Sequence, residues 1–326
     1  MVVMRSGDQS VTPLQPATDQ EMSVKQVMMR SVLEYLGYDD LVTSTTPVPS
    51  DQESDVSEGE MIRRRYSVFL TDLDKTLLTM LSQEIFLNDE DLSSEQYDDV
   101  IEFLSILEQL YPPHSSLSEM ITKMNIVMRQ RSGVSMVRSV MEEYHGVVEE
   151  GWEGCQGSGP QYGGYTCGVW TLWHYLTVAQ HTCDTCEAGH VLRSMINYVR
   201  HFFSCRHCAD HFLKMTNNGS RVEEVETTED AVMFLWEAHN NVTLRLINDE
   251  DDQTDDPAFP KQFFPSREFC PKCFDEEDVN KEETLQFLIK HYSSKSIINN
   301  SYSSSATNII FDISLHLLIS GGLLLL

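Results

Sequence analysis

The stretch at residues 191–215, VLRSMINYVRHFFSCRHCADHFLKM, decides the fold expected for this chain. Its apolar residues recur every three to four positions, as they do on one face of a helix. No glycine or proline interrupts it, so the pattern predicts one continuous helix. Cys205 and Cys208 form a C-x-x-C inside it, with Arg206 and His207 between them. A helix holds two such thiols close enough to form a disulfide, and nearby positive charge lowers a thiol pKa.

The cysteine pattern leaves three interpretations open. The gap between the first two pairs suits a zinc site, which would make this a zinc-stabilised, non-catalytic interaction domain. Zinc knuckles usually turn tightly, whereas the central pair lies among bulky helix formers, so a redox role is favoured and no metal is expected. Inert structural cysteines are the third interpretation. The chain has three C-x-x-C pairs: Cys183/Cys186, Cys205/Cys208 and Cys270/Cys273.

Composition limits the classes of partner. The 326 residues allow two domains, and 41% hydrophobic content is enough for packed cores. A formal charge of −28 argues against nucleic acid and against anionic membrane surfaces as partners. All eight cysteines follow residue 154, so disulfide chemistry is confined to one region.

The domain organisation expected from the sequence is mainly α. Residues 1–38 are too short for a core of their own, and 39–60 have linker composition. Residues 61–149 carry four helical patterns without cysteine, at 66–86, 93–111, 115–131 and 134–148. Residues 150–293 form the cysteine-bearing domain, and 294–326 a linker and hydrophobic tail. The segment 309–326 is marginal in length for a membrane span.

Two predicted helices each present aromatic and histidine side chains on one face. Cys155 and Cys167 bracket a glycine-rich loop, which we expect them to close as a disulfide. A single tryptophan or histidine on an apolar helix face usually belongs to the core. Two such faces in one domain also suit a planar cofactor, so a flavin or nucleotide pocket is a second hypothesis. The faces consist of Trp170 and His174 on the first helix, and of Trp236, His239, Asn240 and Thr243 on the second.

Five motifs carry a resemblance to a known family. They are W-x-x-W-H at 170–174, H-F-F-x-C-x-x-C-x-x-H-F at 201–212, W-x-x-H-N-x-V-x-x-R-L at 236–246, F-P-K at 259–261 and the late C-x-x-C at 270–273. Together they resemble the Erv/ALR flavin-linked sulfhydryl oxidase family, and within it the quiescin-type members. The resemblance is strong over 150–293 and weaker over 61–149. Residues 1–37 resemble the end of that branch's second thioredoxin-like domain, so the chain is expected to be a fragment lacking the first one, or to rely on a separate thioredoxin-like protein.

The resemblance implies an Erv/ALR-type four-helix bundle that binds FAD, oxidises reduced proteins or small dithiols, and reduces O2 to H2O2. Cys205 would be the interchange thiol and Cys208 the thiol beside the flavin. Cys155–Cys167 and Cys270–Cys273 would be further disulfides, whereas Cys183 and Cys186 are extra and would form a loop disulfide, a metal site or an auxiliary shuttle. The implied FAD contacts are Trp170, His174, His207, His211, Trp236, His239, Asn240, Val242 and Lys261, with Thr243 and Phe264 in place of a usual Asn and Trp.

The family and its disulfides also imply a location in the secretory pathway, in the Golgi or ER lumen or outside the cell. Residues 309–326 are a candidate anchor there. Sequons at Asn218, Asn241 and Asn299 are compatible with a glycoprotein, although such sequons often arise by chance. Gly163 stands where the family often has an arginine near the cofactor, so one phosphate contact is expected to be absent.

Overall fold

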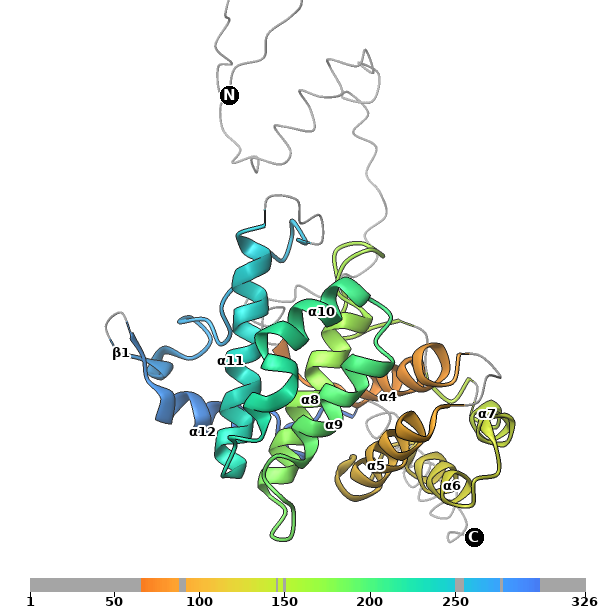
Figure 1. Ribbon diagram of the computed structural model, residues 1–326. Coiled ribbons are helices and arrows are strands. Elements are labelled where there is room, and N and C mark those ends of the chain that lie inside the picture. The colour runs from red at the N-terminus through yellow and green to blue at the C-terminus, as the bar shows by residue number, and fades with distance from the viewer. Residues whose placement is uncertain are drawn as a thin grey trace, which may run out of the picture. The chain divides into compact units, whose positions relative to one another are not determined.

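The computed structural model describes residues 66–87, 92–144, 146–148, 151–249, 255–275 and 278–299 (Figure 1). Within these ranges the chain is mostly helical, and the predicted mainly α class is confirmed. The described strands are β1 (Phe274–Asp275) and β2 (Asp278–Val279), which pair antiparallel. The predicted remnant at 1–38, the linker at 39–60 and the hydrophobic tail at 309–326 lie outside the described residues. None of the helices seen in these ranges has the length and apolar character needed to cross a bilayer.

The cysteine-free part forms helices close to those predicted. The second begins with a capping box, in which Ser93 and Gln96 satisfy each other's backbone N–H, and it ends just before Pro112. The fourth ends at Glu142 rather than at residue 148. The elements are α4 (Leu70–Thr79) with its π-helical continuation η1 (Met80–Ile85), α5 (Ser94–Leu110), α6 (Ser118–Arg129) and α7 (Val134–Glu142).

The cysteine-bearing part also consists mainly of helices. Its long helix α11 is opened by a capping box between Thr227 and Asp230. The elements are α8 (Tyr165–His181), α9 (His190–His201), α10 (Arg206–Met215), the 3-10 turn η2 (Asn217–Val222), α11 (Thr228–Ile247), the 3-10 turn η3 (Pro271–Cys273) and α12 (Lys281–His291).

Helix α8 lies at the centre, with α4 and α11 packed against it (Figure 1). Trp173 of α8 is fully buried and its ring lies 5.5 Å from that of Phe103 on α5. One continuous hydrophobic core therefore joins the cysteine-free helices to the cysteine-bearing ones. The predicted domain boundary near residue 150 stays a prediction: the segments on its two sides share this core, which does not mark a boundary between them.

The α4–α8 contact depends on the absence of one side chain. A Cβ on Gly168 would lie 1.9 Å from Oγ1 of Thr76, which is itself fully buried. To make room for that Cβ, Oγ1 of Thr76 would have to leave its 2.7 Å hydrogen bond to the Asp72 carbonyl. Glycine at residue 168 therefore sets the close approach of the two helices.

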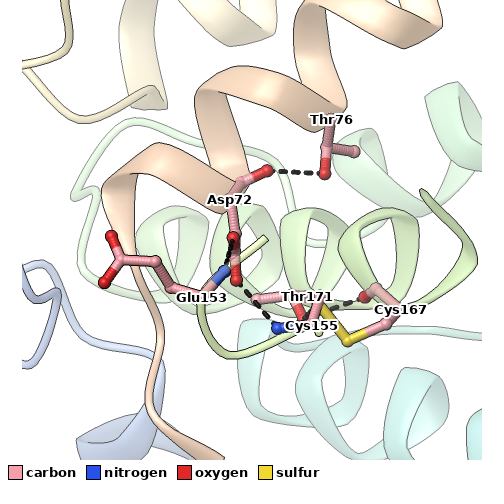
Figure 2. The surroundings of a disulfide bond; sticks show 6 residues. All are labelled: Asp72, Thr76, Glu153, Cys155, Cys167 and Thr171. Atoms are coloured by element: carbon pink, nitrogen blue, oxygen red, sulfur yellow. Dashed lines mark hydrogen bonds between the residues drawn. A yellow bond between two sulfur atoms is a disulfide. The ribbon is translucent and has the colours of Figure 1, made fainter. Parts of the chain in front are cut away.

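Asp72 on α4 fastens the loop that leads into α8 (Figure 2). Its buried carboxylate accepts hydrogen bonds from the backbone N–H groups of Glu153 (2.8 Å) and Cys155 (2.9 Å). Cys155 in turn is bonded to Cys167 in the first turns of α8. Burial raises the pKa of Asp72, while the backbone hydrogen bonds act in the opposite direction.

The continuous helix predicted over 191–215 is wrong. Helix α9 ends at His201 and α10 begins at Arg206, so the chain leaves the helical path between them. The segment between them is held from outside the local sequence: Oε1 of Glu84 accepts hydrogen bonds from the backbone N–H of Ser204 (3.1 Å) and from its hydroxyl (2.7 Å). A backbone N–H bound in this way is not available to the helix. The break places the C-x-x-C at the start of α10 instead of inside a helix.

Candidate redox site

All eight cysteines are paired. The predicted loop disulfide, Cys155–Cys167, and the pair at Cys270–Cys273 are both present. The extra pair Cys183–Cys186 also forms a loop disulfide. With every sulfur in a disulfide there is no free thiolate to bind zinc, and no group of three or more His, Cys, Asp or Glu side chains suited to a metal lies in the described ranges. The four disulfides are Cys155–Cys167, Cys183–Cys186, Cys205–Cys208 and Cys270–Cys273.

The Cys205–Cys208 disulfide opens α10. Cys205 is the N-cap residue, and its sulfur accepts a hydrogen bond from the backbone N–H of Cys208 at 3.3 Å. The N-terminus of a helix carries partial positive charge, which stabilises a thiolate placed there. Cys208 is exposed and Cys205 half-buried, whereas Cys270 and Cys273 are buried. Among the C-x-x-C pairs, this one combines access with a setting that activates a thiol.

Rings from three helices stack into one cluster. Trp170 of α8 lies flat on His239 of α11, with ring centres 4.1 Å apart and planes within 3°. Nε2 of His174 is 3.1 Å from Nδ1 of His239, and His174 also stacks on Tyr292 at the end of α12, at 4.8 Å. Nδ1 of His174 is buried without a hydrogen-bond partner. Buried polar atoms are normally satisfied, so this nitrogen points to a ligand group that the cluster would receive.

The histidines of the cluster are neutral at neutral pH. Burial lowers the pKa of His239 to about 4, and burial likewise lowers the pKa of His291, next to Tyr292, to about 4. The pKa of His174 lies well below its usual range, first because of burial and then because of the positive charge that His239 and His291 would carry. Neutral rings offer flat surfaces and both donor and acceptor nitrogens.

Asn240 and Trp236 hold a loop against α11. The indole N–H of Trp236 donates to the Phe264 carbonyl at 2.6 Å, and the Asn240 amide donates to the same oxygen at 2.7 Å. The Phe264 N–H donates back to the Asn240 side-chain oxygen at 2.8 Å. These three predicted residues therefore come together, and the loop forms one wall beside the ring cluster.

The other predicted contacts lie around this cluster. His207 and His211 stand on the exposed face of α10, with ring centres 4.5 Å apart. Desolvation lowers the pKa of His211, and the charge of Arg245 on α11 adds to the effect. Lys261 binds Asp255 on the loop before Phe264. Val242 and Thr243 are half-buried, one turn beyond His239 on α11.

Sequence reasoning missed three residues at the site. Tyr292 and His291 close the ring cluster from α12. In the sequence, only their position as two adjacent ring-bearing residues at the end of a predicted helix could have pointed to them. No sequence pattern points to Glu84, since it lies 120 positions before its partner Ser204.

A hollow lined by Arg193, Arg200 and neighbouring residues lies between α9 and η2, and none of the predicted site residues lines it.

The fold and the site define a class: a helical protein with a C-x-x-C disulfide at the start of a helix that packs against a cluster of aromatic rings. That helix is α10, and the centre of its Phe212 ring lies 6.0 Å from that of Trp170. The sequence profile of the Erv1 / Alr family matches residues 167–265. The solved structure of the "Sulfhydryl Oxidase Fragment of Human QSOX1" is similar with a TM-score of 0.65 and 30% identity, over 72% of this chain and 99% of that one. The chain belongs to the Erv1 / Alr family, and the predicted Erv/ALR-type fold is confirmed.

Two curated relatives are both called "Sulfhydryl oxidase 1". The one from Gallus gallus is 31% identical over 246 residues, which is 70% of this chain and 32% of the relative. The one from Homo sapiens is 29% identical over 272 residues, 78% of this chain and 36% of the relative. The chain thus spans about a third of the length of these curated relatives.

Proposed function

We propose that this chain is an FAD-dependent thiol oxidase, which converts dithiols to disulfides and reduces O2 to H2O2. The observation that carries the proposal is the accessible Cys205–Cys208 disulfide at the N-terminus of α10, the helix that packs against the Trp170 ring cluster. The relatives named sulfhydryl oxidase support it.

In the proposed thiol–disulfide exchange, Cys205 and Cys208 have different roles. A substrate thiolate attacks Cys205, and Cys208 leaves as a thiolate; the second substrate thiol then attacks the mixed disulfide and releases Cys205. The substrate leaves as a disulfide, so two electrons and two protons remain with the Cys205–Cys208 dithiol. The helix N-terminus stabilises the thiolate formed at Cys205.

When bound, FAD would supply the acceptor for both electrons and the chemistry by which O2 is reduced. The residues present fit a planar cofactor: the rings of Trp170 and His239 are flat and stacked in parallel, the histidines are neutral, and Nδ1 of His174 lacks a partner. The residues proposed to hold it are Trp170, His174, His207, His211, Trp236, His239, Asn240, Val242, Thr243, Lys261 and Phe264.

Substrates and location belong to the same proposal. Reduced proteins and small dithiols are the proposed electron donors, with a separate thioredoxin-like protein as the proposed carrier between them and Cys205. The secretory pathway is the proposed location, where disulfides persist.

The test is a visible absorption spectrum of the purified chain, before and after dithiothreitol is added in air, with a peroxide assay. Flavin bands that bleach with thiol while peroxide accumulates are the expected result. Cys208→Ser should abolish both bleaching and peroxide, whereas the control Cys183→Ser/Cys186→Ser should retain both. A colourless protein with about one bound zinc per chain would overturn the proposal in favour of a structural metal site.

A further inference from the structure

Glu84 is a carboxylate of the cysteine-free part that reaches the redox segment. It lies in η1, a π-helical turn in which the Phe86 N–H bonds to the Leu81 carbonyl. Turns of this kind are rare and frequently occur at functional sites. Glu84 is half-buried, so its charge must be balanced by hydrogen bonds.

Four donors converge on this carboxylate. Oε1 accepts from the N–H and the hydroxyl of Ser204, at 3.1 and 2.7 Å. Oε2 accepts from the hydroxyl of Tyr165 at 2.8 Å and from that of Tyr198. The two tyrosine hydroxyls are also 2.8 Å from each other. Burial and the Glu84 charge raise the pKa of Tyr165, so it stays a donor.

These donors come from the segments that frame the disulfide. Tyr165 opens α8, Tyr198 lies in the last turn of α9, and Ser204 directly precedes Cys205. Helix α9 ends at His201, and the N–H of Phe203 bonds to the Tyr198 carbonyl five residues earlier, at 3.1 Å, so Ser204 lies in the non-helical segment between α9 and α10. Glu84 thereby holds the residue directly before Cys205, in the segment that joins the end of α9 to the start of α10.

We propose that Glu84 is a positioning residue for the Cys205–Cys208 disulfide, holding the segment before Cys205 so that the two sulfurs stay in bonding geometry at the start of α10. The role of Glu84 in catalysis rests on the proposed oxidase function: a dithiol whose sulfurs are held in bonding geometry returns readily to the disulfide and gives up its two electrons. The carboxylate charge acts in the same direction, since an anion near Cys205 disfavours the thiolate of the reduced form.

The experiment measures the thiol–disulfide equilibrium of Cys205 and Cys208 in glutathione buffers, in the full chain. Free thiols are trapped with one alkylating reagent and disulfides with a second after reduction. Trypsin then releases HFFSCR (201–206) and HCADHFLK (207–214), whose mass labels report each cysteine separately. This readout needs neither flavin nor turnover, so it is independent of whether the chain proves to be an oxidase.

Glu84→Ala should shift this equilibrium toward the dithiol by about tenfold, which corresponds to about 30 mV for a two-electron couple. Glu84→Gln keeps one acceptor oxygen for Ser204 but loses the charge, so it should shift less. Ser204→Ala changes an exposed residue and keeps its backbone N–H, so the variant should still fold. It should shift the equilibrium in the same direction, and its effect should not add to that of Glu84→Ala.

Asp99→Ala is the matched control. Asp99 on α5 also anchors α9, through Asn197 (2.7 Å) and His201 (2.7 Å), but it does not bind Ser204. This variant should lose stability while leaving the glutathione equilibrium within about twofold of the wild type. An unchanged equilibrium in both Glu84→Ala and Ser204→Ala, or an equal shift in Asp99→Ala, would refute the positioning role.

Discussion

At the scale of single residues, the neutral histidines of the ring cluster make stability depend on pH. In the unfolded chain a histidine titrates near 6.5. In the folded protein burial lowers the pKa of His239 and of His291 to about 4. As the pH falls from about 6.5 toward 4, the unfolded chain therefore binds protons that the folded protein does not, and stability should fall across this window.

Urea unfolding measured at intervals between pH 7 and pH 4.5 checks this expectation. His239→Gln removes one of the titrating groups and should flatten the pH dependence relative to the wild type. Comparing the two proteins isolates the histidine from carboxylates such as Asp72 and Asp74, whose pKa values burial raises and which titrate in both. Parallel pH profiles for wild type and variant would contradict the neutral cluster.

The sequence indicated some site residues and not others, for a physical reason. Trp170 with His174, and Trp236 with His239 and Asn240, are three or four positions apart, so helical geometry alone places them on shared faces. Which face meets which, and that Trp170 would lie flat on His239, depends on how α8 and α11 pack. Glu84 belongs to no local pattern at all, since its partners are contributed by other helices.

At the scale of elements, the close approach of α4 and α8 predicts the effect of one added methyl group. Gly168→Ala should reduce the free energy of unfolding by about 2–3 kcal/mol, because the new Cβ overlaps the Thr76 hydroxyl. Thr76→Ala removes that hydroxyl, so the double variant should recover part of the loss. Urea unfolding of the four proteins gives the coupling, and additive effects would show that the overlap is not the cause.

A second element-scale prediction concerns the clamp between α4 and the loop before α8. Asp72→Asn replaces a carboxylate that accepts two backbone N–H groups by an amide that accepts with one oxygen only. The loss should be about 2 kcal/mol, because a buried N–H is left without its charged acceptor. Asp98→Asn is the control, since Asp98 is exposed and its ion pair with Arg131 should contribute little. Equal effects of the two variants in urea unfolding would argue against the clamp.

The break between α9 and α10 shows what a local pattern does not contain. Apolar spacing and the absence of glycine and proline predicted one helix over 191–215, and both parts of that stretch are indeed helical. The first ends at His201, and Ser204, in the segment between the two, donates its N–H to a carboxylate from η1 instead of to a helical carbonyl. A sequence window contains propensity and period but not a hydrogen-bond acceptor that arrives from another helix.

At the scale of the whole molecule, the shared core predicts that the cysteine-bearing part does not fold alone. Residues 150–299 expressed by themselves would expose the faces of α8 and α9 that α4 and α5 cover, and would lose Glu84 and Asp72. We expect no cooperative unfolding transition for this piece, in contrast to residues 61–299, which serve as the control. A cooperative transition in the short piece would instead support the predicted domain boundary at residue 150.

The disulfides are all local, closing sequence separations of 12, 3, 3 and 3 residues. No covalent bond besides the backbone therefore ties the helices before residue 149 to those after it. A chain cut there would be two polypeptides held together by non-covalent contacts, among them those of α4, η1 and α5 with their partners. Because one half carries Glu84 and the other the cysteines, such halves, fused to two proteins that bind each other, would make a split reporter whose signal depends on their association.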